Sequence, residues 1–340
     1  MTLTSNNKQV YTPIFKGGLG NILYQISMAL SMAKDWDGEA LFYKQVEKDA
    51  KDYRPFGGHS LIKKENLPDS LESMFPKLRF YSDPKFHTEV KNLGTVYTEK
   101  KLLRYERLPD EAKKRSTVLE GYFFARRYFE HNLGYIRNML KPAESVTKYI
   151  FEKYQDVLSD NSVSLHLRMG NISDNFEAEQ IPLEWYRHVF ELLPIDSQFV
   201  VCSDNPSKAK SFLQTEMGDR KFYFIENEPM YVDLFVMAKC RHHILHNSTL
   251  SAWVAFLSDQ KGKVYYNNPG FEHIHGKDAV AKEWIDGEPF KKRVLKKIKV
   301  WTSFEALRWR IKEIRRDFLH RYFNIYYVLD HEEGIYKEKK

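Results

Sequence analysis

The sequence predicts an α/β protein built from two domains and a basic helical tail. Apolar strand-like segments alternate with helix-like segments from residue 163 to 266, which is typical of a parallel, Rossmann-like sheet. A glycine-rich turn joins a strand pattern to a helix pattern near the N-terminus, and the alternation stops after Trp284, where Lys and Arg accumulate. We therefore place an N-terminal α/β domain at residues 1–142, a Rossmann-like domain at 143–285 and the tail at 286–340.

The first domain opens with a strand, a glycine turn and a helix. Residues 11–15 form an apolar strand pattern, and residues 17–21 read Gly-Gly-Leu-Gly-Asn. Gly18 and Gly20 let the backbone approach a ligand without a Cβ atom in the way, and the helix start behind them offers unpaired N–H groups to an anion. The helix pattern rests on four apolar residues at helical spacing, Leu23, Ile26, Leu30 and Ala33. The turn matches neither a Walker P-loop nor the G-x-G-x-x-G dinucleotide fingerprint.

The rest of the chain alternates strands and helices with short connections. Between residues 37 and 141, apolar segments are separated by polar loops, and residues 119–124 are predicted to be a strand or its exit. The second domain then shows strand and helix patterns in turn. Its predicted strands are 163–167, 198–202, 221–225, 243–246 and 263–266, and its predicted helices are 183–193, 207–213, 231–240 and 251–257.

Polar side chains follow three of these strands at the point where each ends. The first group contains His166, Arg168 and Asn171, the second contains Asp204, and the third contains Asn247, Ser248 and Thr249 and leads to Ser251. Because the carboxyl ends of parallel strands share one edge, we expect these groups to converge on one crevice. An arginine there can hold a diphosphate with its planar fork. The hydroxyls can bind phosphate and the aspartate a base or ribose, which favours a nucleotide-sugar as ligand.

Each group also has a simpler interpretation. Arg168 could form a surface ion pair. Residues 203–206, Ser-Asp-Asn-Pro, could be a helix N-cap followed by a turn proline, and residues 247–249 could cap the next helix. Capping and phosphate binding use the same N–H groups, so the two interpretations are compatible.

Composition and charge argue against several other classes of protein. The net charge of +7 is concentrated between Glu288 and Tyr322, which hold 12 Lys and Arg against four acids, so the body is almost neutral and no nucleic-acid partner is expected. Cys202 and Cys240 lie in apolar runs without zinc or redox spacing, and we expect reduced core residues. The polar N-terminus lacks a signal-peptide core and no apolar run reaches the roughly 18 residues of a membrane span, so a cytoplasmic location is expected.

Five segments carry a resemblance to a known family. They are Gly-Gly-Leu-Gly-Asn-Ile-Leu-Tyr-Gln at 17–25, Leu-Glu-Gly-Tyr-Phe at 119–123, His-Leu-Arg-Met-Gly-Asn at 166–171, a strand ending in Ser-Asp at 199–204, and Tyr-Val-Asp-Leu at 231–234 with Asn-Ser-Thr-Leu-Ser-Ala-Trp at 247–253. In the same order they resemble G-G-L-G-N-Q-M/L-F-Q, L-x-G-Y-F/W, H-x-R-R-G-D, a strand ending in Ser-Asp, and Y-x-D-M/L followed by N-S-T-F-S-W-W. These are motifs of the α-1,2-fucosyltransferases, glycosyltransferase family 11.

The resemblance implies an inverting, metal-independent transfer of L-fucose from GDP-β-L-fucose to a glycan hydroxyl, α-1,2 to galactose, on a GT-B-like pair of Rossmann-type domains. Arg168 would hold the departing diphosphate, where a fixed cation favours the transition state because negative charge grows on that group. Asn21 would close over the donor from the first domain, as the second catalytic candidate. The other implied donor-binding residues are His166 and Asp204 on the guanosine, Ser248 and Thr249 on phosphate, and Gly18, Gly20, Asn247 and Ser251.

Two positions depart from the family motif. Its second arginine is Met169 here and its aspartate is Asn171. Losing one cation could weaken diphosphate binding by about 1–3 kcal/mol. An amide cannot act as general base, so the base for the acceptor is unassigned. Two other functions therefore stay open: transfer of a different GDP-sugar on the same scaffold, and a non-catalytic nucleotide-binding or adaptor protein.

No metal and no other cofactor is expected. Asp35-Trp36-Asp37 resembles the Asp-x-Asp with which many glycosyltransferases hold a metal, but it follows the first helix and precedes Gly38, so we interpret it as a C-terminal turn. No Cys/His cluster has zinc spacing.

The basic tail has an amphipathic pattern. Apolar residues from Val294 to Phe318 recur near helical spacing among Lys and Arg. This pattern fits a helix in residues 288–322 that lies on an anionic membrane surface, near a membrane-bound acceptor. An ordinary helix that packs back on the body fits equally well.

Overall fold

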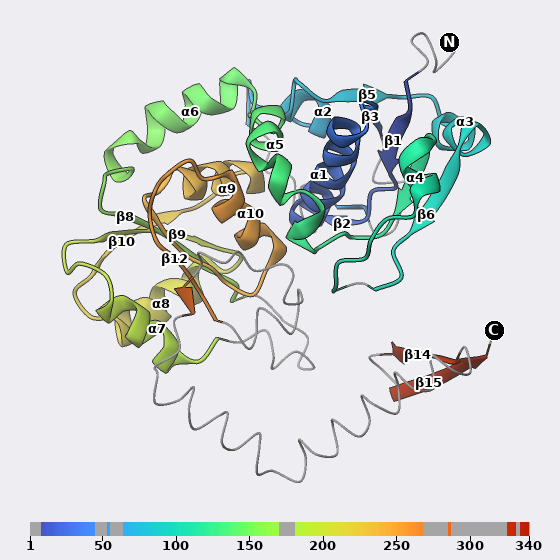
Figure 1. Cartoon of the computed structure of the whole chain (residues 1–340). Coiled ribbons are helices and arrows are strands. Elements are labelled where there is room, and N and C mark those ends of the chain that lie inside the picture. Colours follow the sequence, from blue (N-terminus) through green and yellow to red (C-terminus); the bar gives the residue numbers. More distant parts are fainter. Residues whose placement is uncertain are drawn as a thin grey trace. The chain divides into compact units, whose positions relative to one another are not determined.

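The structure is a computed structural model that describes residues 8–44, 53–54, 64–101, 103–169, 181–267, 285–286, 325–330 and 334–339 (Figure 1). The chain forms two compact units. The first covers residues 1–170 and 178–287. It contains two large parallel sheets with their helices, and a two-stranded parallel sheet formed by β2 (Gly17–Gly18) and β4 (Tyr53–Arg54). The second covers residues 171–177 and 288–340.

The first sheet has five parallel strands in the order β5-β3-β1-β7-β6. They are β1 (Val10–Pro13), β3 (Glu39–Tyr43), β5 (Arg79–Tyr81), β6 (Thr95–Thr98) and β7 (Thr117–Glu120). The chain builds outward from β1 through β3 to β5 and returns on the other side of β1, so the strand order reverses between β1 and β7. The strand predicted at 11–15 is confirmed as β1, and segment 119–124 contains the end of β7 and its exit.

Helix α1 (Leu19–Asp35) follows the glycine turn, as predicted, and is almost entirely enclosed. Fourteen of its 17 residues are buried, because the helix packs against β1 and β3 of the first sheet and against a helix of the second half. It ends at Asp35, and Asp37 adopts a positive φ of 48°, which confirms the turn interpretation of this segment. The other helices of this half are α2 (Leu71–Met74), α3 (Phe86–Leu93), α4 (Asp110–Lys114) and α5 (Leu133–Met139).

The second sheet has six parallel strands in the order β10-β9-β8-β11-β12-β13. They are β8 (Ser162–Leu167), β9 (Gln198–Ser203), β10 (Lys221–Ile225), β11 (His242–Ile244), β12 (Val264–Tyr266) and β13 (Ile285–Asp286). The helices are α6 (Glu144–Tyr154), α7 (Leu183–Glu191), α8 (Pro206–Glu216), α9 (Met230–Lys239) and α10 (Thr249–Leu257). Every strand and helix predicted for this half is confirmed, and the pair of parallel α/β sheets bears out the predicted architecture.

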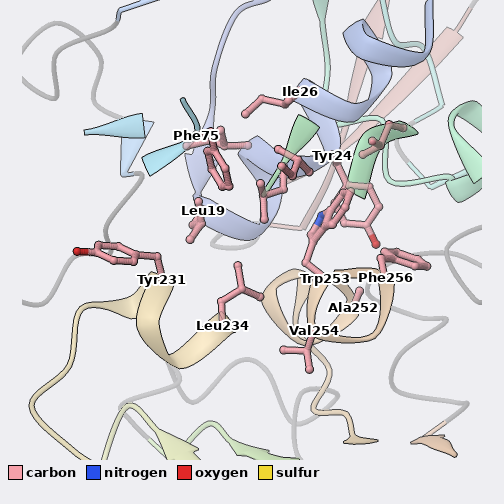
Figure 2. Close-up of a cluster of buried hydrophobic side chains, with 14 of the residues drawn as sticks. Leu19, Tyr24, Ile26, Phe75, Tyr231, Leu234, Ala252, Trp253, Val254 and Phe256 are labelled. Atoms are coloured by element: carbon pink, nitrogen blue, oxygen red, sulfur yellow. The ribbon is translucent and has the colours of Figure 1, made fainter. Parts of the chain in front are cut away.

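The two sheets share one buried core. Tyr24 on α1 packs edge-on against Trp253 of α10 with 5.3 Å between ring centroids, and against Phe124 after β7 at 5.4 Å. Figure 2 shows Tyr24, Trp253 and Phe256 together between α1 and α10. Because each aromatic ring buries a large apolar area, this contact ties the halves firmly together. The predicted boundary near residue 142 stays a prediction, and the expectation of buried free cysteines at Cys202 and Cys240 is confirmed.

The tail differs from its prediction where it is described. β14 (Ile325–Asp330) and β15 (Gly334–Lys339) pair as an antiparallel hairpin, so the predicted helical tail is wrong for these residues. The amphipathic segment 288–322 lies outside the described residues. Among the residues the structure does describe, no helix is both long and apolar enough to cross a membrane.

Candidate functional site

The site lies where the strand order of the second sheet reverses. The chain passes from β8 to β9 and β10 on one side, and later places β11 and β12 on the other side of β8. In open parallel sheets the crevice at such a reversal is the usual ligand position. His166 and Arg168 stand at the end of β8, and Asn247 and Ser248 follow β11. The first and third predicted polar groups therefore lie at this reversal. The second group, Asp204, lies beside them at the end of β9.

His166 is held by Ser251. Its Nδ1 lies 2.6 Å from the Ser251 hydroxyl, which also accepts the backbone N–H of His246 at 3.2 Å. The His166 and His246 rings are 6.0 Å apart. Burial lowers the pKa of His166 to about 4 and that of His246 to about 3. The charge of Arg168 contributes to both shifts, while Asp204 acts in the opposite direction on His166. Both imidazoles are therefore neutral at physiological pH, and charge at this edge comes from other groups.

Arg168 is the cation of the site. Its side chain is 49% exposed, and its Nε lies 3.9 Å from one carboxylate oxygen of Asp204. The other oxygen of Asp204 accepts the backbone N–H of Met169 at 2.7 Å. Asp204 thus fixes the chain as it leaves β8 and steers the guanidinium, which leaves the exposed part of Arg168 available to an anion. The surface ion pair that the sequence allowed is present, but it is long and lies at the strand-order reversal.

The predicted capping interpretations also hold, alongside the site. The Asn205 side chain caps α8 by accepting the N–H of Lys208, with Pro206 in the first turn. The Ser248 hydroxyl caps α10 by accepting the N–H of Leu250 at 3.3 Å. Asn247, beside it, is buried. The β11–α10 connection is therefore set by local helix chemistry, which places the N-terminus of α10 at the crevice.

The glycine turn brings a second helix N-terminus to the same place. Gly17 has φ +79°, a left-handed conformation that favours glycine. Gly18 is the N-cap of α1, and no side chain of the described residues caps this helix. A Cβ on Gly20 would lie 2.5 Å from the backbone nitrogen of Leu250. The absence of a side chain at Gly20 therefore allows α1 and α10 to pack closely together.

Asn21 and Thr249 join the two halves directly. The Thr249 hydroxyl donates to Oδ1 of Asn21 at 2.8 Å. Asn21 was predicted to close over the donor; in this structure its hydrogen-bond partner is Thr249 of the second half. The donor contacts of Asn21, Gly18, Gly20, Asn247, Ser248, Thr249 and Ser251 stay predictions, and Asn171 lies outside the described residues.

Sequence reasoning missed Glu99, which follows β6 at the edge of the first sheet. One of its carboxylate oxygens accepts the backbone N–H groups of Tyr122 and Phe123 at 2.8 and 3.1 Å. The other is buried and has no hydrogen-bond partner among the described residues. Burial raises the pKa of Glu99 to about 7. A glutamate after a strand is common, and nothing in the sequence distinguishes it from its exposed neighbours.

Asp35 and Asp37 have different partners in the structure. Asp35 accepts hydrogen bonds from the side chains of His131 and Asn132, at 2.9 and 2.6 Å. Asp37 instead pairs with Lys8 at 2.7 Å. The two carboxylates are therefore used separately at the end of α1.

Comparison with known proteins places this geometry in context. The sequence pattern of glycosyl transferase family 11 matches residues 13–288. An alpha-1,2-colitosyltransferase of Escherichia coli is 23% identical over 286 residues, which are 79% of this chain and 96% of that protein. The O-antigen biosynthesis glycosyltransferase WbnK of Escherichia coli is 28% identical over 123 residues, 33% of this chain and 40% of that protein. Among solved structures, fucosyltransferase NodZ from Bradyrhizobium is 12% identical, with 75% of this chain and 94% of that chain covered and a TM-score of 0.44.

Proposed function

The chain belongs to glycosyl transferase family 11, and from that premise we propose that it transfers L-fucose from GDP-β-L-fucose to a glycan hydroxyl. The linkage proposed is α-1,2 to galactose, and the reaction inverts the donor's anomeric configuration without a metal. The named linkage of the Escherichia coli colitosyltransferase supports the α-1,2 assignment. The sequence resemblance supports the donor.

One observation carries the proposal: Arg168 stands at a strand-order reversal where two helix N-termini also meet. Each N-terminus acts as about half a positive charge. Gly20 of α1 and Leu250 of α10 are in close contact, so these partial charges repel each other unless an anion lies nearby. A diphosphate would bring negative charge to both helix N-termini and to the guanidinium. Neutral His166 adds hydrogen bonding without adding charge.

The chemistry follows from where the negative charge develops. As the bond between the sugar and the diphosphate breaks, the leaving group gains negative charge and the sugar becomes oxocarbenium-like. Arg168 is fixed by Asp204 before reaction, so its charge stabilises that transition state more than the ground state. The acceptor hydroxyl attacks from the opposite face of the sugar and loses its proton to a base. That base stays unassigned.

A second candidate donor is a different GDP-sugar on the same scaffold. The relative that matches this chain over most of its length is named for colitose transfer. Met169, in place of the family's second arginine, is a further difference close to the diphosphate. Both observations concern the donor, and neither changes the reaction type.

The experiment is turnover with a panel of GDP-sugars, with and without galactose-terminated acceptors. Release of GDP from GDP-fucose, together with an α-1,2-fucosylated product, supports the proposal. Turnover of a non-fucose donor alone would reassign the donor. Binding of GDP without turnover of any donor, with galactoside or other glycan acceptors, would indicate the nucleotide-binding adaptor. Added EDTA should leave the rate unchanged.

The basic segment 288–322 is the proposed membrane contact of a cytoplasmic enzyme. Its 12 cations and four acids support attraction to anionic lipid. Sedimentation with anionic and with neutral liposomes tests this contact on the full chain. Equal binding by a chain truncated at Pro289, or no binding by the intact chain, would contradict it.

A further inference from the structure

The contact between Ser251 and His166 decides which ring nitrogen carries a proton. Ser251 is fully buried on α10, and its hydroxyl oxygen accepts the backbone N–H of His246. Among the described residues, the other hydrogen-bond partner of this hydroxyl is Nδ1 of His166 at 2.6 Å. Ser251 therefore has one proton to donate and one acceptor within reach.

Counting protons excludes the opposite arrangement. If Nδ1 of His166 donated, the Ser251 hydroxyl would accept twice and its own proton would be buried without a partner. An unmet buried donor costs about 1–3 kcal/mol. If the hydroxyl donates to Nδ1, all three groups are satisfied, and neutral His166 must carry its proton on Nε2.

We propose that Ser251 is a positioning residue that holds His166 in the Nε2–H tautomer, so that His166 presents a hydrogen-bond donor to an acceptor atom of the bound nucleotide. This inference rests on the proposed function. It also excludes His166 as the base that activates the sugar acceptor, because the ring's only lone pair in the plane is occupied by Ser251. The other groups that face this ring are neutral His246, Arg168 and Asp204, and none of them competes for Nδ1 in the structure.

The chain contains a matched control for this contact. Ser164, on the same strand as His166, lies 2.9 Å from Nδ1 of His243. Both residues are buried, and strand pairing places this pair three residues before the end of β8. Ser164→Ala removes the same type of hydroxyl–imidazole contact away from the crevice. It should change the His243 signals and leave nucleotide binding alone.

The first test reads the tautomer directly in the full-length protein without ligand. Histidine labelled with ¹⁵N gives separate signals for protonated and unprotonated ring nitrogens, and His166→Gln identifies the signals of residue 166. We expect Nε2 protonated and Nδ1 unprotonated at neutral pH, and a shift toward a mixture of tautomers in Ser251→Ala. A protonated Nδ1 in the wild type, or an unchanged tautomer in Ser251→Ala, overturns the proposal.

The second test measures GDP affinity by calorimetry. Ser251→Ala should weaken GDP binding by about two- to tenfold, the scale of one hydrogen bond, whereas Ser164→Ala should not. A glutamine amide reaches the Nε2 position and an asparagine amide only the Nδ1 position, so His166→Gln should retain more affinity than His166→Asn. The reverse ranking, or equal losses in Ser251→Ala and Ser164→Ala, contradicts the assignment. The two His166 variants keep the test valid if Ser251→Ala fails to fold.

Pyrophosphate distinguishes which part of the nucleotide provides the acceptor atom. If His166→Asn weakens GDP but not pyrophosphate, the acceptor belongs to the nucleoside; equal losses place it on a phosphate. If the tautomer is as proposed but neither ligand binds the wild type, the proposed function fails while the role of Ser251 in positioning the ring stands.

Discussion

The two sheets present different chemistry at their strand-order reversals. Beyond β8 in the second sheet stands a half-exposed guanidinium, with neutral imidazoles behind it. Beyond β1 and β7 in the first sheet lie a glycine turn and a backbone loop that grips the carboxylate of Glu99. The second sheet thus carries a fixed positive charge at its reversal. The first carries a glycine turn, backbone N–H groups and one buried acid. The proposed function therefore assigns the anionic donor chiefly to the second sheet.

The loop of the first sheet is built around Glu99. Its carboxylate fills the space that a side chain on Gly121 would need, since a Cβ there would lie 2.8 Å from the carboxylate oxygen. Phe123, which donates to that oxygen, adopts a positive φ of 57° although it is not glycine. A non-glycine residue in this region is strained by an order of 1 kcal/mol or more. The carboxylate and the burial of Phe123 together hold the loop in place.

The largest expected effect comes from removing the cation of the second sheet. Arg168→Ala should lower the transfer rate by about 10²- to 10³-fold, the scale of losing one preorganised group that stabilises transition-state charge. Steady-state kinetics with the donor measures this. The matched control is Arg187→Ala, an equally exposed arginine on α7 that pairs with Glu216. A rate near wild type for Arg168→Ala would refute the division between the sheets.

The next effect concerns the contact between the halves. Gly20→Ala should destabilise the protein by about 1–3 kcal/mol, because the added Cβ would meet backbone atoms of Thr249 and Leu250 at 2.7 and 2.5 Å. Urea unfolding measures the change. Gly134→Ala on α5 is the control, since a Cβ there meets nothing within 4 Å, and it should be neutral or stabilising. Similar effects for both variants would show that the helix ends can separate freely.

Glu99 should make stability depend on pH. Its pKa is raised by burial to about 7 in the folded protein, so the folded state favours the protonated acid. The contribution of Glu99 to the free energy of unfolding is fully present below pH 4.5, the pKa of this group in the unfolded chain. It is lost as pH rises through about 7, the pKa in the folded protein. Glu99→Gln should remove this loss, a relative gain on the order of 1–2 kcal/mol at pH 8 over pH 5, allowing for partial exposure. Thermal unfolding at both pH values measures it, with exposed Glu152→Gln as control. An unchanged pH dependence of stability in Glu99→Gln would contradict a raised pKa for Glu99 in the folded protein.

The smallest effect is the hydrogen bond across the halves. Thr249→Val keeps the shape of the side chain but removes the donor to Asn21. A double-mutant cycle with Asn21→Ala should give a coupling of about 1 kcal/mol in the free energy of unfolding. Zero coupling, with each single change independent, would mean that the contact contributes nothing and that Asn21 is available to a ligand.

The order and type of most secondary-structure elements could be predicted from the amino-acid sequence. Strong apolar periodicity and the glycine turn located α1 and every strand from β8 to β12, because short-range pattern dictates which residues can be buried in a regular segment. It also identified His166, Arg168 and Asp204 as neighbours, because parallel strands end at a common edge. The helical prediction did not hold for the tail at 325–330 and 334–339, whose strands pair as an antiparallel hairpin.

The contacts and hydrogen bonds of individual side chains could be learned from the three-dimensional structure alone. It showed that Ser251 contacts His166 and that Asp204 accepts a hydrogen bond from the Met169 N–H. It also showed that Gly20 packs closely against the backbone of Leu250. It also revealed Glu99, whose raised pKa depends on burial by residues far away in the chain. Hydrogen bonds and desolvation depend on the positions of atoms from several segments at once. A linear pattern records which groups are present, but the three-dimensional packing selects their partners.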